Sequence, residues 1–276
     1  MNQQQELKIN WFPGHMVTTL RTIGEHLKLC DIIVYVLDGR CPLSCLNPKF
    51  NEFTERKPTL FVLNKADLST VKNFPHKPFI TLDSTTSGTA KRVTAAIQKL
   101  LADKIKTARA KGINKTIRAI VIGVTNCGKS TLINNLAGKG KTLTGDKPGV
   151  TRTKQWVKSK IQPDAGEFWV LDTPGTLYPN LSGDDAVKAK NLAYVGSIRD
   201  EVLDFIALSK QLLVDLEKLQ PGSVKKRFGT TDFVELCKRR GYILRGRELD
   251  EERAAKAILT EFRAGRLGRF NLDGLL

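Results

Sequence analysis

Residues 123–130 read Gly-Val-Thr-Asn-Cys-Gly-Lys-Ser, and this stretch decides the fold. It follows an apolar run rich in β-branched residues, 117–122, and it leads into residues 132–136, which have helical periodicity. A strand, a glycine-rich turn and a helix in this order are the setting in which the G-x-x-x-x-G-K-[ST] pattern binds phosphate. Backbone N–H groups and the helix N-terminus then face the phosphate oxygens. The stretch therefore predicts a nucleotide phosphate site.

Side chains within this loop have distinct predicted roles. The Lys129 ammonium is expected to contact the β- and γ-phosphates and to act in catalysis, and the Ser130 hydroxyl is expected to bind Mg²⁺. The neighbours predicted to line the same nucleotide are Thr125, Asn126, Cys127, Gly128 and Thr131. A chance glycine turn before a helix is the alternative, and the correctly placed strand and helix weigh against it.

Composition predicts a globular protein with a polyanionic partner. The 276 residues are 41% hydrophobic and carry a formal charge of +17, which favours nucleic acid over a membrane. An ordinary basic surface is the alternative.

The cysteines predict neither disulfides nor a zinc site. Their number, five, is odd, so no disulfide framework is expected, and Cys41-x-x-x-Cys45 lacks the second pair of ligands that a zinc site needs. The sequence shows neither a signal pattern nor an apolar run of about 20 residues, so we expect a cytoplasmic protein.

The distribution of apolar runs predicts an α/β fold. Strand-like runs alternate with helical patterns up to about residue 183, which is typical of a parallel sheet with helices on both faces. The predicted strands are 32–37, 59–63, 78–82, 117–122, 155–161 and 167–171. The predicted helices include 89–109 and, beyond residue 183, 187–195, 200–218, 233–240 and 248–262. We therefore predict a nucleotide-binding domain at 1–183 and a smaller all-α, basic, RNA-binding domain at 184–276.

A second motif predicts which base is bound. Residues 64–67 read Asn-Lys-Ala-Asp directly after the second predicted strand. The Asp67 carboxylate can accept hydrogen bonds from N1–H and the exocyclic amine of guanine, a pair of donors that adenine lacks. Asn64 and Lys65 are expected to brace this loop and pack on the base. The motif is short, and an ordinary strand-to-loop turn is its alternative.

Further segments complete the predicted GTP site. Ser84 and Thr85 are expected to close over the guanine oxygen, although GTPases usually carry Ala at the Thr85 position. Asp172 and Gly175 belong to a D-x-x-G segment, which supplies a carboxylate that reaches Mg²⁺ through water and a backbone N–H near the γ-phosphate. Thr151, in a loop rich in Gly, Thr and Lys, is the candidate hydroxyl that senses Mg²⁺ and the γ-phosphate. Together with the phosphate loop, these elements predict hydrolysis of GTP.

The order of these motifs differs from that of a Ras-like chain. The base motif and its closing loop here precede the phosphate loop, so we predict a circularly permuted Ras-like P-loop GTPase domain. Surface termini that lie close together permit such a permutation. The order also places 172–175 last before the basic helical region, so nucleotide state can be transmitted into that region.

With these motifs the sequence resembles the RbgA/YlqF family of circularly permuted ribosome-assembly GTPases. The resemblance covers nearly the whole chain and rests on 11–16, Asp38-x-Arg40-x-Pro42-x-Ser44 with Asn47-Pro48, 64–67, 123–131, 148–151, 172–175, 261–263 and 268–269. It implies a GTPase that docks on the late precursor of the large ribosomal subunit, contacts ribosomal RNA through both domains and leaves after hydrolysis. DNA binding and integral membrane association are not expected, and the protein is expected to be monomeric off the ribosome.

The resemblance also concerns the catalytic water. The family lacks the water-orienting glutamine after D-x-x-G and usually has a hydrophobic residue there, and its N-terminal histidine is the proposed substitute. His15 is that histidine here, whereas Thr176 departs from the family's hydrophobic residue. The resemblance therefore implies a catalytic role for His15. Its alternative is a residue at the start of a helix with a satisfied hydrogen bond.

Asn126 matches a position at which family members and other potassium-stimulated GTPases hold K⁺ between the β- and γ-phosphates. An Asn that caps the loop is the alternative.

Two other functions of the protein stay open. One is a nucleotide-gated RNA chaperone with vestigial hydrolysis. The other is a basic GTPase at anionic membranes, which the spread of arginines over several helices disfavours.

Overall fold

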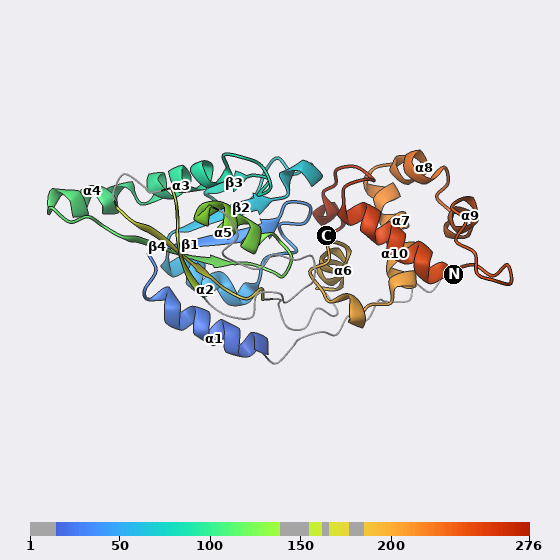
Figure 1. The fold of residues 1–276 in the computed structure, drawn as a ribbon, viewed down its shortest axis with the longest axis horizontal. Coiled ribbons are helices and arrows are strands. Elements are labelled where there is room, and N and C mark those ends of the chain that lie inside the picture. The colour runs from blue at the N-terminus through green and yellow to red at the C-terminus, as the bar shows by residue number, and fades with distance from the viewer. Residues whose placement is uncertain (1–14, 139–154, 162–165, 177–184) are drawn as a thin grey trace.

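The computed structural model describes residues 15–138, 155–161, 166–176 and 185–276 (Figure 1). Within these ranges six strands form one sheet in the order β3-β2-β1-β4-β6-β5. The strands are β1 (Ile32–Asp38), β2 (Thr59–Asn64), β3 (Phe79–Thr81), β4 (Ile117–Ile122), β5 (Gln155–Lys158) and β6 (Phe168–Asp172). The predicted α/β class is confirmed.

The two strands β1 and β2 lie in the buried interior of the sheet. All of their residues are buried, which requires apolar side chains on both faces and agrees with the continuous apolar runs in the sequence. β1 is parallel to β2 and β4, and β4 is parallel to β6. Asp38 at the end of β1 pairs in register with Asn64 at the end of β2. The loops that follow these parallel strands therefore meet at one edge of the sheet.

Helices cover both faces of the sheet (Figure 1). Figure 1 shows α3 and α5 on one side and α1 and α2 on the other. The bounds are α1 (His15–Leu27), α2 (Asn51–Arg56), α3 (Thr89–Leu100), α4 (Ala102–Ala110) and α5 (Lys129–Ala137). In α1, Ile23 and Leu27 are buried while Arg21 and Glu25 are exposed. One apolar stripe therefore attaches this helix to the sheet.

Residues 185–276 form a helical part that extends from one end of the sheet (Figure 1). Its helices are α6 (Ala186–Tyr194), α7 (Phe205–Leu219), α8 (Ser223–Phe228), α9 (Phe233–Arg239) and α10 (Glu251–Arg263), and α7 packs on α10. Asp204, Asp232 and Asp250 cap α7, α9 and α10 by accepting a hydrogen bond from the backbone N–H three residues on. Among the described residues, no helix is long and apolar enough to cross a membrane.

The end of the chain returns to the sheet. The Leu272 N–H donates to the Arg40 carbonyl at 2.7 Å. The Asp273 carboxylate accepts hydrogen bonds from the Leu43 N–H at 2.6 Å and from the Ser44 hydroxyl at 2.6 Å. Figure 1 shows the C-terminus between the sheet and the helical part. The helical part is thus joined to the sheet by side-chain contacts as well as by the chain itself.

Several expectations from the sequence differ from the structure. The helix predicted at 89–109 is two helices, because Leu101 leaves helical geometry with φ −102° and ψ 13°. β5 runs antiparallel to β6, so the sheet is not wholly parallel. The sequence pattern also misses α2 and α8, since a six-residue helix is too short to display a helical period. The predicted domain boundary near residue 183 falls outside the described residues and stays a prediction.

Candidate nucleotide site

The phosphate loop follows β4, and close backbone contacts require its glycines. Gly123 has a φ of 149° and Gly128 a φ of 96°, conformations that favour glycine. A Cβ on Gly123 would collide with the Val36 carbonyl oxygen, and one on Gly128 would collide with the Asn64 side chain. The loop therefore passes between β1 and the base motif with space for backbone alone.

The predicted phosphate-binding side chains gather where α5 begins. Lys129 is buried, and its ammonium donates to the Val124 carbonyl across the loop at 2.6 Å. Ser130 and Thr131 lie in the first turn of the same helix. A helix N-terminus beside a buried ammonium is a positive region suited to phosphate. The geometry fits the roles predicted for Lys129 and Ser130.

Asp172, the last residue of β6, fits a Mg²⁺ site. The residue is 1% exposed, and its Oδ1 atom has no hydrogen-bond partner among the described residues. Burial raises the pKa of Asp172 to about 6, although the charge of Lys129 opposes this shift. A buried carboxylate oxygen without a partner is suited to a hard cation and the water around it.

The turn after β6 packs directly on the phosphate loop. A Cβ on Gly175 would lie 2.7 Å from the Thr125 Cα, so a larger residue could not approach as closely. The Thr176 N–H donates to the Gly123 carbonyl at 3.1 Å. Thr176 is fully buried, and its hydroxyl has no partner within the described part of the chain. Its side chain is therefore enclosed by the fold and does not project as a water-orienting glutamine would.

Asn64 connects three loops of the site. Its side-chain nitrogen donates to the Cys127 carbonyl in the phosphate loop at 2.9 Å. Its side-chain oxygen accepts hydrogen bonds from the Ser84 N–H at 2.9 Å and the Ser84 hydroxyl at 2.8 Å. One buried amide thus holds the base motif against both the phosphate loop and the predicted closing loop.

Lys65 and Asp67 flank the opening of the base motif. The Lys65 ammonium donates to the Asn126 carbonyl at 2.7 Å, so it also braces the phosphate loop. Asp67 is exposed in a 3₁₀ turn, η2 (Ala66–Leu68), and no described residue hydrogen-bonds its carboxylate. This exposed carboxylate is therefore accessible to a ligand, as the role predicted for Asp67 requires.

The Thr85 amide is already occupied. It donates to the Asp83 carboxylate at 2.8 Å, in a local turn that Asp forms readily with the residue two positions later. The role predicted for Thr85 at the guanine oxygen therefore requires this amide to leave Asp83. An Asp two residues before Thr85 is a local pattern, so this turn could have been predicted from the sequence.

Two predicted catalytic residues cannot be placed. Thr151 lies outside the described residues. His15 is the first residue of α1, and its side chain is not described. Residues 11–14 and 148–150, which contribute to the family resemblance, also lie outside the described ranges.

The turn after α6 forms a wall of the site that the sequence does not predict. The Thr125 hydroxyl donates to the Ser197 carbonyl, and the Ser197 hydroxyl donates to the Thr125 carbonyl at 2.8 Å. The Asn126 side-chain amide donates to the Gly196 carbonyl at 3.4 Å. This contact joins Asn126 to the helical part and is not the cap of its own loop that the sequence left as an alternative.

Asp38 joins the base motif to a buried arginine. The Nε and Nη2 atoms of Arg40 donate to the Asp38 carboxylate at 2.9 and 2.8 Å, and the Lys65 ammonium lies 3.0 Å from the same carboxylate. Burial disfavours the charged form of Asp38, but the charges of Arg40 and Lys65 outweigh it and hold the pKa well below its usual range. Asp38 ends a central parallel strand, a position that usually lies at a ligand site. This position was the feature of the sequence that could have indicated the buried contacts of Asp38 with Arg40 and Lys65.

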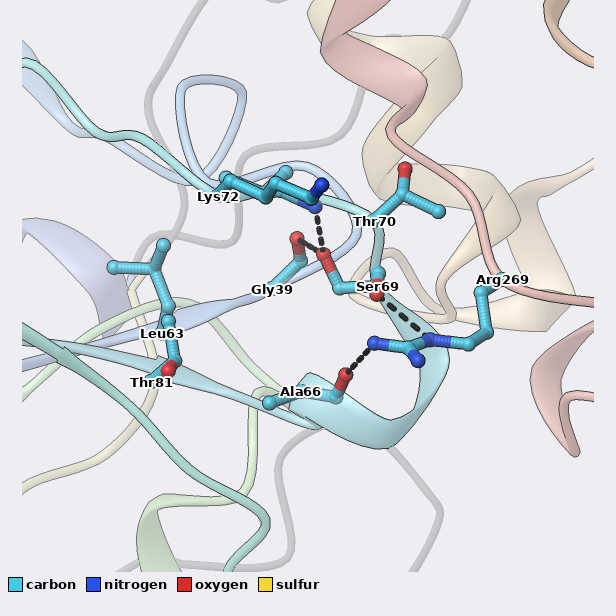
Figure 2. Close-up of a pocket in the computed structure, with 9 residues that line it drawn as sticks. Gly39, Leu63, Ala66, Ser69, Thr70, Lys72, Thr81 and Arg269 are labelled. Atoms are coloured by element: carbon cyan, nitrogen blue, oxygen red, sulfur yellow. Dashed lines mark hydrogen bonds between the residues drawn. The ribbon is translucent and has the colours of Figure 1, made fainter.

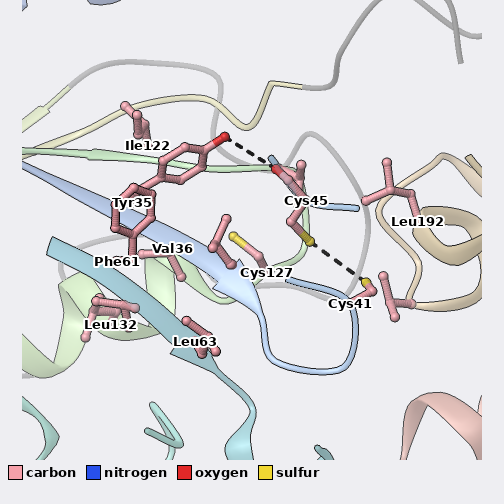
Figure 3. Close-up of a cluster of buried hydrophobic side chains, with 14 of the residues drawn as sticks. Tyr35, Val36, Cys41, Cys45, Phe61, Leu63, Ile122, Cys127, Leu132 and Leu192 are labelled. Carbon is pink, nitrogen blue, oxygen red and sulfur yellow. Dashed lines mark hydrogen bonds between the residues drawn. The ribbon is translucent and has the colours of Figure 1, made fainter. Parts of the chain in front are cut away.

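Cysteines pack around the inner side of the phosphate loop. Figure 3 shows Cys127 among apolar side chains, with Cys45 and Cys41 nearby and the two latter sulfurs 3.9 Å apart. All five cysteines are buried and free. Burial raises the pKa of the Cys127 thiol, so the residue serves as a small apolar side chain beneath the phosphate site.

Several known proteins are similar to this chain in sequence and architecture. A family model described as 50S ribosome-binding GTPase matches residues 118–227. Ribosome biogenesis GTPase A of Bacillus cereus is 36% identical, over 96% of this chain and 93% of that protein. Mitochondrial ribosome-associated GTPase 1 of Bos taurus is 32% identical, over 95% and 88%. A solved structure described as GDP-bound TM YlqF is 25% identical with a TM-score of 0.62, covering 91% of this chain and 98% of that one.

Proposed function

Because this chain belongs to the ribosome biogenesis GTPase A family, we propose that it binds ribosomal RNA on a precursor of the large ribosomal subunit and that this contact stimulates its hydrolysis of GTP to GDP and phosphate. The observation that carries the GTP-hydrolysing part of this proposal is the Asn64 side chain, which contacts both the phosphate loop and the closing loop. The residues proposed to recognise the base and those proposed to bind phosphate are thereby held together in one site.

Guanine is the base that this site fits. The Asp67 carboxylate is exposed and has no described hydrogen-bond partner, so it accepts hydrogen bonds from N1–H and the exocyclic amine of guanine. Adenine presents no such pair of donors and leaves the carboxylate unsatisfied. Lys65 extends along the base while its ammonium remains bound to the Asn126 carbonyl.

The residues proposed to act in hydrolysis lie in the first turn of α5 and at the end of β6. Lys129 would contact the β- and γ-phosphates, and Ser130 directly and Asp172 through water would hold Mg²⁺. When bound, Mg²⁺ would supply positive charge that neutralises the phosphate oxygens. Gly175 presents its backbone N–H toward the γ-phosphate. We further propose that His15 orients the attacking water and that Thr151 senses Mg²⁺ and the γ-phosphate.

A potassium ion is proposed beside Asn126. The Asn126 side-chain nitrogen donates to Gly196, which favours the side-chain oxygen as the atom that faces a cation. A cation there would supply charge between the β- and γ-phosphates, where other GTPases use an arginine finger. Replacing K⁺ by Na⁺ at constant ionic strength is expected to slow hydrolysis, and Asn126→Ala is expected to remove the difference.

Basic side chains of the helical part fall into two groups, and the unpaired group supports RNA binding. Three exposed arginines are paired with glutamates: Arg227, Arg239 and Arg240 contact Glu261 or Glu235. Other exposed cations have no partner among the described residues: Lys225, Lys226, Lys238, Arg245 and Arg247. Unpaired cations can replace the counterions of RNA phosphates without first breaking an internal ion pair.

Sedimentation with ribosomal particles tests the proposal. The purified chain, loaded with a non-hydrolysable GTP analogue or with GDP, is centrifuged with precursors of the large subunit or with small subunits. We expect recovery with the large-subunit precursor in the GTP-analogue state and crosslinks to its ribosomal RNA. Equal recovery with both particles, or recovery that does not depend on nucleotide, would contradict the proposal.

A further inference from the structure

We infer that Arg269, near the C-terminus, is a positioning residue for guanine selection because it fixes the turn that carries Asp67. The inference rests on the proposed base site at Asn64, Lys65 and Asp67. Figure 2 shows the Arg269 side chain reaching from the C-terminal segment to the turn that follows β2. The two hydrogen bonds of this contact join residues that are 200 and 203 positions apart in the sequence.

Arg269 holds the turn on both sides of Asp67. Its Nη2 atom donates to the Ala66 carbonyl at 3.2 Å, and its Nε atom donates to the Ser69 carbonyl at 2.9 Å (Figure 2). A guanidinium presents its donors in a rigid planar fork, so the two hydrogen bonds fix Ala66 and Ser69 relative to each other. Asp67 lies between these two anchored residues.

The backbone beside Arg269 makes a second connection to the same turn. The Phe270 N–H donates to the Leu68 carbonyl at 3.1 Å, and the Thr70 N–H donates to the Phe270 carbonyl at 3.3 Å. Ser69 and Phe270 form an isolated parallel bridge. A Cβ on Gly265 would collide with the Leu68 side chain, so the C-terminal segment lies close against the turn.

The C-terminal segment is itself held in place, which makes Arg269 a fixed support. Leu272 donates its N–H to the Arg40 carbonyl at 2.7 Å and accepts a hydrogen bond from the Asn191 side chain at 3.1 Å. The Asp273 carboxylate accepts a hydrogen bond from the Ser44 hydroxyl at 2.6 Å. These contacts anchor the segment to the loop after β1 and to α6.

The turn that carries Asp67 is a single 3₁₀ turn, in which the Leu68 N–H donates to the Lys65 carbonyl at 3.0 Å and the Ser69 N–H to the Ala66 carbonyl at 3.3 Å. The Ala66 N–H also donates to the Leu82 carbonyl at 3.1 Å, and the Ser69 hydroxyl donates to the Gly39 carbonyl at 2.5 Å. A cavity of about 260 Å³ lies beside it, and its lining includes Gly39, Ala66, Ser69 and Arg269 (Figure 2). Side chains do not fill this space, so loss of the two Arg269 hydrogen bonds leaves room for the turn to shift within its remaining backbone contacts.

Base discrimination reports how well Asp67 is placed. Guanine offers the carboxylate two donors, whereas hypoxanthine has the N1–H and lacks the exocyclic amine. A well-placed Asp67 therefore favours GDP over IDP. A displaced Asp67 loses the second hydrogen bond first, because that bond depends on the orientation of the whole carboxylate.

Calorimetric titration of the full chain with GDP and IDP tests the inference. Arg269→Ala is expected to weaken GDP binding about tenfold, or about 1.4 kcal/mol, and to weaken IDP binding less, so the affinity ratio contracts. Arg269→Lys keeps the charge but lacks the fork, so its ratio is expected to lie between those of the parent and Arg269→Ala. Arg266→Ala is the matched control, since Arg266 is exposed and its side chain has no partner within the described residues.

A double-mutant cycle separates positioning from a general loss of binding. In an Asp67→Ala background, Arg269→Ala is expected to change the ratio no further. An unchanged ratio in Arg269→Ala, or an equal effect of Arg269→Ala with and without Asp67, overturns the inference. A parental ratio in Asp67→Ala alone would instead overturn the proposed base site, and the inference with it.

Discussion

Thr125 of the phosphate loop and Ser197 of the helical part exchange two hydrogen bonds, although 72 residues separate them. Both residues are buried, and each hydroxyl donates to the carbonyl of the other. Arg263 of α10 supports the same turn by donating to the carbonyls of Ala193 and Tyr194 at 3.0 and 3.1 Å. The predicted phosphate loop is therefore held from the helical part, which links the proposed nucleotide site to the region proposed to bind RNA.

Ser197→Ala tests this contact. The change leaves the buried Thr125 carbonyl without its donor, and we expect a loss of about 1–3 kcal/mol in the free energy of unfolding together with weaker GTP binding. Ser209→Ala is the matched control, because the Ser209 hydroxyl is buried and donates to Ile206 within its own helix. Urea unfolding and nucleotide titration measure both effects. Equal GTP affinities in the two variants would show that Ser197 does not support the phosphate loop.

The pH dependence of stability tests the environment of Asp172. Burial raises its pKa to about 6 from a usual value of 3.8, so between these values the folded protein without Mg²⁺ holds a proton that the unfolded chain has released. The free energy of unfolding contributed by this group therefore falls as pH rises through the window, by at most about 3 kcal/mol. Asp172→Asn removes this contribution.

Urea unfolding of the parent and of Asp172→Asn, without Mg²⁺, isolates the group from other carboxylates. The stability of the parent relative to the variant is expected to decline from about pH 4 to about pH 6. Adding Mg²⁺ is expected to stabilise the parent most at higher pH, where the carboxylate is ionised. A difference that does not vary with pH would mean that Asp172 titrates normally.

Breaking the buried Asp38–Arg40 ion pair is expected to destabilise the fold strongly. Arg40→Ala leaves the Asp38 carboxylate buried with one remaining cation, Lys65, and such losses cost about 3–5 kcal/mol. Arg21→Ala is the control, because it breaks the exposed Arg21–Glu25 pair and is expected to cost less than about 1 kcal/mol. Denaturant unfolding measures both changes. Similar values for the two variants would contradict the buried network.

Salt dependence distinguishes the two groups of basic residues in the helical part. We compare a variant that neutralises the unpaired Lys225, Lys226 and Lys238 with one that neutralises the paired Arg227, Arg239 and Arg240. Each phosphate contact contributes about 0.7–0.9 to the slope of log affinity against log salt. The unpaired set is therefore expected to flatten the slope of binding to large-subunit precursors more than the paired set. The reverse order would reject the assignment of the RNA-binding cations.

The nucleotide motifs are predictable from the sequence because each is a local signal. Asn64, Gly123 and Asp172 lie at or just after the ends of strands that form apolar runs, and parallel strands bring such positions to one edge. Glycine at Gly128 and Gly175 marks places where a side chain would collide with a neighbouring loop. These constraints act over a few residues and so leave a readable pattern.

Contacts between distant surfaces leave no such pattern. Ser197 meets the phosphate loop from 72 residues away, Arg269 meets Ser69 from 200 and Asp273 meets Ser44 from 229. Helical periodicity indicates which face of a helix is apolar but not which loop it will meet. The break at Leu101 could not be predicted for a related reason. The helical spacing of apolar residues continues across Leu101, although the backbone there leaves helical geometry.

Single-turnover GTP hydrolysis with and without large-subunit precursors tests the central claim most directly. The chain is loaded with GTP and mixed with saturating precursor, with small subunits or with buffer alone, and the release of phosphate is followed. The account predicts slow hydrolysis in buffer and with small subunits and a clearly faster rate with the large-subunit precursor. The same rate under all three conditions would contradict it.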